Sequence, residues 1–305
     1  MFETIFYPFG FPLIVRSNDE LVLTIAHEEW DPWRQAFDDP PIELEFRINP
    51  RPHQPPLPAA EFHANSYGFT IRSSPANIAL GKPYRRSALA FLEPRTVANR
   101  PYFTYFFLDA MAFQLITSAN LTPLHAASVA RNGRAIVFTG DSGAGKSSLS
   151  YACARRGWTF VSDDASHLLR RCASARRILG VPHSIRLRPD APNLFPELAR
   201  FEPKLRGTGK MSLQIPTGEL GLTTAPTASV DWIILPRRGA QTRLMPLDKS
   251  AIREHCAQWF YHWDAPVLAQ QEAAFDEMLD GVDTFSLEYA DLDSAVDVLD
   301  ARFGG

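Results

Sequence analysis

The stretch Gly140-Asp141-Ser142-Gly143-Ala144-Gly145-Lys146-Ser147 lies between a strand-like and a helix-like segment. The apolar run Ile136-Val137-Phe138 precedes it, and helix-forming residues follow over 147–155. The eight residues fit the pattern GxxxxGK[ST]. Its glycines let backbone N–H groups approach phosphate oxygens, and the following helix points its positive end at the anion. The sequence therefore predicts a strand, a phosphate-binding loop of the Walker A type and a helix, and hence nucleotide binding.

The side chains of this loop have distinct predicted tasks. Lys146 supplies a mobile positive charge to the β- and γ-phosphates, and Ser147 offers its hydroxyl to a magnesium ion. ATP and Mg2+ are therefore the expected ligands. The predicted nucleotide-contacting residues are Gly140, Asp141, Ser142, Gly143, Ala144, Gly145, Lys146, Ser147 and Ser148. The alternative interpretation is an ordinary glycine turn without a ligand.

Two adjacent carboxylates, Asp163 and Asp164, follow the short apolar run Trp158-Thr159-Phe160-Val161. If this run is a strand beside the one that enters the loop, the carboxylates face the loop, because ligands bind at the carboxyl ends of parallel strands. Asp163 is the expected catalytic base, ionised at neutral pH, and Asp164 the expected magnesium ligand, although the two roles are interchangeable at this stage. The alternative interpretation is a helix cap.

Together these segments resemble the catalytic domain of HPr kinase/phosphorylase and its relatives. The family pattern is a histidine upstream of a hairpin, a GDSGxGKS loop, a helix ending in Arg-Gly and a strand ending in Asp-Asp. The matching residues are Leu124-His125, the run over 136–147, Arg156-Gly157 and Val161-Ser162-Asp163-Asp164. The resemblance implies a fold related to phosphoenolpyruvate carboxykinase and an ATP-dependent, magnesium-requiring kinase that phosphorylates a serine on a protein partner. It also implies that one of the two aspartates is the base and that His125 lies near the site.

Outside residues 124–164 the resemblance is loose. The first hundred residues do not match the usual N-terminal domain of the family, and the later glycine-rich signature of the bifunctional enzyme is not found. The resemblance therefore implies kinase activity and leaves open whether the chain has phosphorylase activity. It points to the HPr kinase-related proteins, whose targets can be peptides or small molecules.

Basic residues further along the chain are weaker candidates for the same site. Arg186 and Arg188 lie in a strand-like run, whereas Lys204, Arg206 and Lys210 lie in a glycine-containing loop. Such a loop can close over the γ-phosphate and supply the positive charge that phosphoryl transfer needs. Lys210 is the predicted catalytic residue of this loop, and a solvated loop is the alternative.

The predicted fold class is α/β, in two domains. Residues 1–98 are expected to form a small α+β recognition or assembly domain. It should contain strands at 12–16, 42–48, 62–71 and 87–92, the latter two in an antiparallel sheet, a helix over 19–30 capped by Ser17 or Asn18, and a proline-rich loop over 50–58. Residues 99–305 are expected to form an HPr kinase-like P-loop catalytic domain.

The second predicted domain begins with a buried aromatic helix over 99–118. A hairpin follows, with strands at 126–130 and 135–139 around the turn Asn132-Gly133. After mixed structure over 163–224, strands are predicted at 229–235 and 285–289. Helices are predicted at 247–261 and 266–279, and a closing helix begins near Asp291.

The composition argues against several other classes of protein. Lys and Arg number 31 and Asp and Glu 34, so the net charge is −3, whereas a dominant nucleic-acid binder is usually basic. The three cysteines, Cys153, Cys172 and Cys256, form no CxxC pair, and Cys153 is expected in the core. No apolar stretch is long enough to span a bilayer, and the N-terminus does not resemble a signal peptide. A cytoplasmic protein without membrane or nucleic-acid partners is therefore expected.

The leading functional hypothesis is a kinase that transfers the γ-phosphate of ATP to a serine or threonine hydroxyl of a protein or peptide. A small-metabolite kinase, for example of free serine, and a nucleotide-dependent ATPase or switch without an acceptor are the alternatives. A binding-only relative is a further one, against which the intact Lys146, Ser147, Asp163 and Asp164 argue. The sequence leaves open whether the chain forms a homo-oligomer.

Overall fold

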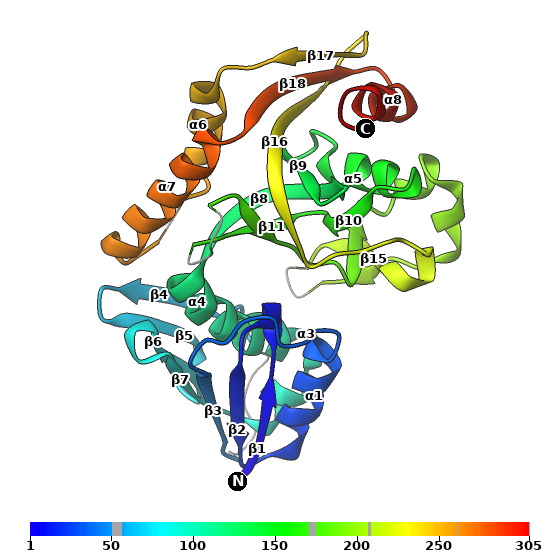
Figure 1. Ribbon diagram of the computed structural model, residues 1–305. Coiled ribbons are helices and arrows are strands. Elements are labelled where there is room, and N and C mark those ends of the chain that lie inside the picture. The colour runs from blue at the N-terminus through cyan, green and yellow to red at the C-terminus, as the bar shows by residue number, and fades with distance from the viewer. Residues whose placement is uncertain (51–56, 171–174, 207–208, 261, 305) are drawn as a thin grey trace. The chain divides into compact units, whose positions relative to one another are not determined.

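The computed structural model describes residues 1–50, 57–170, 175–206, 209–260 and 262–304 (Figure 1). These residues form a mixed α/β structure with three sheets, which agrees with the predicted α/β class. They divide into two compact units. The first unit comprises Met1–Asn120, Arg206–Lys210 and Trp263–Ala265, and the second comprises Leu121–Leu205, Met211–His262 and Pro266–Gly305.

The first unit is built on a seven-stranded sheet in the order β1-β2-β3-β7-β6-β5-β4. The strands are β1 (Phe2–Phe6), β2 (Leu13–Ser17), β3 (Ile42–Ile48), β4 (Glu61–Asn65), β5 (Gly68–Ser74), β6 (Asn77–Lys82) and β7 (Ser87–Leu92). Because β3 pairs with β2 and β7 in parallel, the sheet is mixed, whereas an antiparallel sheet was predicted. The predicted strand at 62–71 is a hairpin, since the Asn65 side chain accepts a hydrogen bond from Tyr67 N at 2.9 Å and closes a turn.

Helices of the first unit pack on its sheet. Helix α1 (Glu20–Trp30) is capped by Asp19, whose side chain accepts from Leu21 N, and not by Ser17 or Asn18 as predicted. Helices α2 (Pro94–Ala98), α3 (Arg100–Phe103) and α4 (Asp109–Asn120) follow later, with a π-helical turn, η3 (Thr104–Leu108), before α4. Trp30 Nε1 donates to Asp109 Oδ1 at 3.1 Å and links α1 to α4.

The boundary between the two units differs from the prediction. The helical run Arg100–Asn120 is largely buried, as the aromatic pattern predicted, but it packs against β3 and β6 of the first sheet. Its Phe103 ring contacts the Phe46 ring of β3, with centroids 5.5 Å apart. The first unit therefore extends to Asn120, whereas the sequence placed the boundary between residues 98 and 99.

The second unit is built on an eight-stranded sheet. Its strands are β8 (Leu121–Arg131), β9 (Arg134–Thr139), β10 (Thr159–Ser162), β11 (Ala165–Leu169), β12 (Arg177–Leu179), β16 (Thr227–Arg238), β17 (Arg243–Pro246) and β18 (Asp283–Tyr289). The predicted hairpin is confirmed: β8 and β9 are antiparallel, and Asn132 and Gly133 turn with φ of 53° and 78°. Strands β9, β16 and β18 are parallel, so their carboxyl ends meet at one edge.

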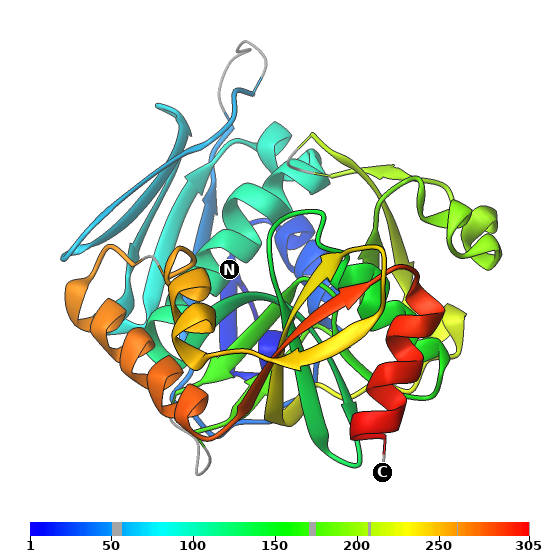
Figure 2. The same ribbon diagram turned by 90° about the horizontal axis from the view of Figure 1, so that it is seen from above.

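Helices cover both faces of this sheet (Figure 2). On one face, α5 (Lys146–Arg155) and α8 (Leu292–Phe303) share a core with Phe138 of β9. On the other face, α6 (Lys249–Ala257) and α7 (Ala265–Asp280) pack around the neighbouring Val137. Adjacent residues of β9 thus point to opposite faces, as the period of a strand requires.

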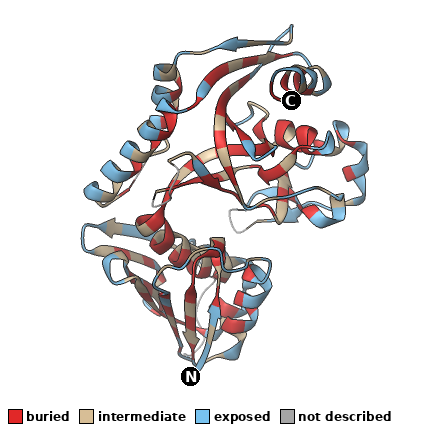
Figure 3. Ribbon diagram, viewed as in Figure 1, coloured by how far each residue is buried: buried red, intermediate tan, exposed pale blue. Residues whose placement is uncertain are grey.

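A small third sheet packs beside α5 in the second unit. It contains β13 (Ser184–Leu187), β15 (Met211–Pro216) and β14 (Lys204–Leu205), and its Leu187 and Leu213 join the core around α5. Cys153 of α5 is buried in this core, as predicted. Most residues of α5 are buried, and the helix is largely red in Figure 3. Short 3-10 turns complete the chain: η1 (Pro8–Gly10), η2 (Pro83–Arg85), η4 (Ala191–Asn193), η5 (Pro196–Arg200) and η6 (Thr217–Leu220).

Two predictions fall partly or wholly outside the described residues. The proline-rich loop over 50–58 includes residues 51–56, and Cys172 lies within 171–174. Among the described helices, none is both long and apolar enough to cross a membrane.

Candidate active site

The glycine-rich segment joins β9 to α5 at the edge where the parallel strands end. Gly143 and Gly145 have φ of 93° and 94°, a left-handed conformation that favours glycine. Gly145 also leaves no room for a side chain, because an added Cβ would lie 2.0 Å from the hydroxyl oxygen of Tyr289. Both the backbone path and the close packing therefore require the glycines that the sequence supplies.

Helix α5 begins at this loop with unused hydrogen-bond donors. Its N-cap, Gly145, provides no side-chain cap, and Leu149 N donates to Gly145 O at 2.8 Å. Within the described part of the chain, the backbone N–H groups of residues 145–148 donate to no protein acceptor. Unpaired N–H groups at the positive end of a helix form an anion-binding site.

Lys146 lies within the loop and is only 6% exposed. Its Nζ donates to the carbonyl oxygens of Gly140 at 2.6 Å and Asp141 at 3.2 Å, and it forms no ion pair with any described residue. Burial lowers the pKa of the Lys146 ammonium, although the charges of Asp164 and Asp141 oppose the shift. A buried cation bound only to neutral carbonyls favours the arrival of an anion.

Asp163 and Asp164 lie in the gap between β10 and β11, and these two strands pair with successive parts of β8. Ser162 ends β10 opposite Ser128, and Ala165 begins β11 opposite His125. The Ser162 hydroxyl donates to Ala165 O at 2.9 Å and accepts from Ala165 N at 3.2 Å, which closes the gap. The helix-cap interpretation is therefore wrong, because a strand follows the pair.

The route by which the aspartates reach the loop differs from the predicted one. Strands β9 and β10 run in the same direction, but β8 lies between them and pairs with both in antiparallel fashion. Asp163 nevertheless meets the loop, since the Ser147 hydroxyl donates to Asp163 O at 3.1 Å. The structure thus brings the predicted loop and the predicted aspartates together through a mixed sheet.

The Asp163 carboxylate is buried, with 5% of the residue exposed. Its Oδ2 accepts a hydrogen bond from Arg186 N at 2.9 Å. Burial raises the pKa of Asp163 to about 7, because desolvation outweighs the Arg186 hydrogen bond and charge. This upward shift differs from the ordinary aspartate, ionised at neutral pH, that the sequence alone predicts.

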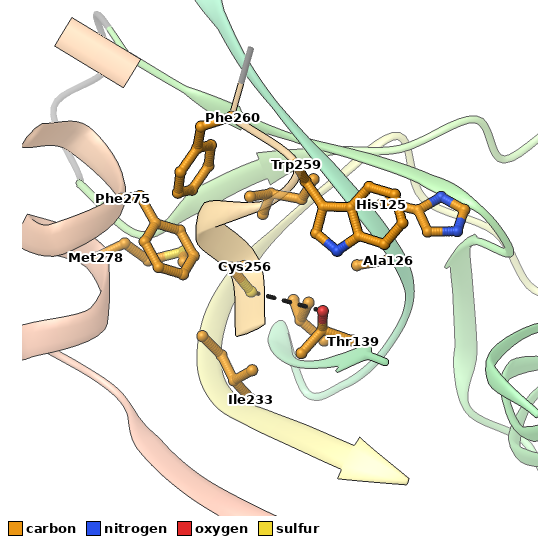
Figure 4. A pocket seen from close by; sticks show the side chains of 11 residues that line it. His125, Ala126, Thr139, Ile233, Cys256, Trp259, Phe260, Phe275 and Met278 are labelled. Carbon is orange, nitrogen blue, oxygen red and sulfur yellow. Dashed lines mark hydrogen bonds between the residues drawn. The ribbon is translucent and has the colours of Figure 1, made fainter. Parts of the chain in front are cut away.

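Asp164 faces a different partner and is more exposed, with 42% of its side chain accessible. Its Oδ1 lies 3.2 Å from His125 Nδ1, and the His125 ring packs against Trp259 with centroids 4.6 Å apart (Figure 4). Burial lowers the pKa of His125, and Asp164 opposes this shift. The predicted position of His125 near the aspartates is thus observed.

A small apolar cavity lies behind His125 (Figure 4). It encloses about 10 Å³, the space of a single water molecule, between Trp259, Thr139 and Cys256. Thr139 Oγ1 and Cys256 Sγ lie 3.6 Å apart across it. The cavity is therefore part of the packing that holds His125 and not a nucleotide pocket.

Replacing Asp164 with Asn should lower the pKa of His125 further. The Asp164 charge favours the protonated imidazole, so its removal leaves desolvation less opposed. An NMR titration of the His125 ring measures the shift. Asp141→Asn, which removes a loop carboxylate that does not perturb His125, is the matched control, and an unchanged or higher His125 pKa in Asp164→Asn would contradict the pairing.

The structure places the two arginine candidates around the loop. Arg186 lies in β13 with its N–H on Asp163. Arg188 follows this strand, and its Nη2 would lie 3.5 Å from a Cβ added to Gly143. Within the described residues the Arg188 guanidinium makes no hydrogen bond or ion pair, so an unpaired cation lies beside the loop.

Lys210 lies in the short connection between β14 and β15. Arg206 N donates to Lys210 O at 2.9 Å, and both residues are grouped with the first unit, whereas the groups above belong to the second. Residues 207 and 208 of the same connection are outside the described residues. The catalytic role of Lys210 therefore stays a prediction.

One residue that contacts the loop was not predicted from the sequence. Tyr289 ends β18, and its hydroxyl donates to Ala144 O at 3.0 Å. The only signal in the sequence was that Tyr289 is the last residue of a predicted strand. That strand, β18, is parallel to β16, so its carboxyl end lies at the same sheet edge as the loop.

Comparisons with known proteins add little to this geometry. No family model and no curated protein matches the chain. Among solved structures, the chain is similar to the Hpr(Ser) kinase/phosphatase from Coxiella burnetii, with 13% identity over 60% of this chain and 99% of that chain, and a TM-score of 0.28. A TM-score and an identity this low establish neither the fold family nor the activity of this chain.

Proposed function

We propose that the second unit binds ATP with Mg2+ and transfers the γ-phosphate to a hydroxyl acceptor. The observation that carries the proposal is the contact between Ser147 and Asp163. Through the backbone carbonyl of Asp163 it ties a loop that has a buried lysine and, among the described residues, N–H donors without a protein acceptor to a residue whose side chain is a buried carboxylate. Anion binding and proton acceptance at one place are the two requirements of phosphoryl transfer to a hydroxyl.

The groups present fit a triphosphate. The free N–H groups of residues 145–148 and the Lys146 ammonium supply donors and positive charge for the β- and γ-phosphates. Arg188, which has no ion-pair partner in the described part of the chain, supplies a second mobile cation beside Gly143. Desolvated donors fixed in advance are the usual means by which proteins stabilise a transferring phosphoryl group.

Magnesium fits a site with few protein ligands. No cluster of three or more His, Cys, Asp or Glu side chains that could hold a metal occurs among the described residues. Mg2+ keeps several waters and takes one or two protein oxygens beside phosphates, and the Ser147 hydroxyl and the Asp164 carboxylate are the groups proposed here. When bound, the ion neutralises charge on the phosphates.

Asp163 is the proposed base. Its buried carboxylate has a pKa of about 7, so its ionised form can take up a proton from a hydroxyl near neutral pH. His125 holds Asp164 by their contact at 3.2 Å. The resemblance of the motifs to HPr kinase supports a serine or threonine acceptor on a protein or peptide, with a small hydroxyl metabolite as the alternative.

The proposal is tested by transfer of label. The protein is incubated with γ-labelled ATP and Mg2+, first with cell lysate and then with a mixture of hydroxyl metabolites, and the labelled species is identified. We expect label on a serine or threonine hydroxyl or on one metabolite, and none with Lys146→Ala. Label that appears only as inorganic phosphate would favour an ATPase, and failure to bind ATP would overturn the proposal.

A further inference from the structure

Tyr289 contacts the glycine-rich loop from a strand distant in sequence. The residue is fully buried at the end of β18. Its hydroxyl donates to Ala144 O at 3.0 Å, and the same oxygen lies 2.0 Å from the position of a Cβ on Gly145. One hydroxyl thus touches both sides of the peptide bond between Ala144 and Gly145.

This contact fixes the orientation of that peptide. A trans peptide is planar, so its C=O and N–H point in opposite directions. With Ala144 O held toward Tyr289, the Gly145 N–H points away from the tyrosine, and it donates to no described protein acceptor. Rotation of the peptide would bury this N–H against the tyrosine and remove one donor from the α5 terminus.

We propose that Tyr289 is a positioning residue for nucleotide binding: its hydroxyl holds the Ala144–Gly145 peptide so that Gly145 N–H is presented to a bound phosphate. The inference rests on the proposed function. It identifies Tyr289 of β18 as the group that fixes the loop conformation before the nucleotide binds. Groups positioned before binding lower the cost of ordering them on binding.

Tyr289 is itself held from two sides. Its backbone O accepts from Gly239 N at 3.0 Å. The Arg238 guanidinium, on the strand residue opposite, lies 4.6 Å from the Tyr289 ring centroid. The backbone of Tyr289 is therefore fixed, and its ring cannot turn away from the loop without losing the Arg238 contact and its buried place.

The test is Tyr289→Phe, which keeps the ring and removes the hydrogen bond. We expect the KM for ATP to rise about tenfold, because a partly buried carbonyl loses its donor and the peptide is freed, while kcat stays within about twofold. The matched control is Tyr151→Phe. Tyr151 lies on α5 and is also buried, and its hydroxyl donates to Glu197 Oε1 of η5 at 3.1 Å and not to the loop.

The outcomes separate the two claims. A rise in KM with Tyr289→Phe but not with Tyr151→Phe supports the positioning role. An unchanged KM with Tyr289→Phe, or an equal rise in both variants, overturns it. If the unaltered protein binds no ATP, the proposed function fails instead, whatever the tyrosine does.

A second pair of variants compares ATP affinities, and general destabilisation would not produce the expected difference between them. Gly145→Ala places a Cβ against the Tyr289 hydroxyl, and without that oxygen the nearest atom of the ring is Cζ at 3.3 Å. We expect ATP affinity to be higher in the double variant Gly145→Ala with Tyr289→Phe than in Gly145→Ala alone. An affinity in the double variant no higher than in Gly145→Ala alone would show that the hydroxyl does not lie against residue 145, and would overturn the positioning role.

Discussion

Lys146→Ala is expected to lower phosphoryl transfer by about a thousandfold and to weaken binding of ATP, because a buried cation at developing charge contributes on this scale. The Lys146 ammonium is the one loop side chain that is nearly excluded from solvent, and it bonds only to the Gly140 and Asp141 carbonyls. Transfer rate and ATP affinity are measured on the same preparation.

Lys249→Ala is the matched control for this variant. Lys249 also donates its Nζ to a backbone carbonyl, that of Asp280 at 2.7 Å, but it is only partly buried and lies at the start of α6, outside the loop. We expect its transfer rate to equal that of the unaltered protein. ATP affinity and turnover in Lys146→Ala equal to those of the control would remove the nucleotide site from this loop.

The features that sequence predicted well are those fixed by neighbouring residues. The path of the loop follows from Gly143 and Gly145, whose φ values only glycine adopts at low cost. The hairpin turn follows from Asn132-Gly133, and the closing helix from Asp291, whose side chain caps Ser294 N at 2.8 Å. Each of these depends on contacts within a few residues.

The features that sequence missed depend on pairing over long distances. Residues 163–224 contain β11 to β15, strands of two to six residues that are too short for a clear alternating pattern. The order in which β8 lies between β9 and β10 has no local signal. The gap that holds Asp163 and Asp164 depends on Ser162 bonding to Ala165, a detail that no spacing rule contains.

The site residues divide in the same way. The motif identified Lys146, Ser147 and the two aspartates, because their spacing along the chain is itself the signal. Tyr289 carried no such signal, since it reaches Ala144 only through the pairing of β18 with β16. The pKa of Asp163 was also missed, because burial by distant elements and not its neighbours in sequence raises it.

Asp163→Asn is expected to lower transfer by about 10² to 10⁴, the usual contribution of a positioned base, while ATP binding persists or tightens. The amide keeps an oxygen that can accept from Arg186 N, so the local fold is retained. It removes the proton acceptor and a negative charge near the phosphates.

Asp164→Asn, by contrast, should raise the magnesium concentration required for transfer.

The pH dependence of Asp163→Asn separates a base from a merely buried carboxyl. Burial raises the Asp163 pKa from 3.8 to about 7, so the folded protein binds more protons than the unfolded one between these values. Stability from this group therefore falls as pH rises from about 4 to about 7 and is constant above, and Asp163→Asn should lack this fall.

Transfer by the unaltered protein should instead rise through pH 7, as the base ionises. Denaturant unfolding and transfer rates across pH 4 to 9 measure both, and near-normal transfer in Asp163→Asn and Asp164→Asn would leave a nucleotide-binding loop without a kinase.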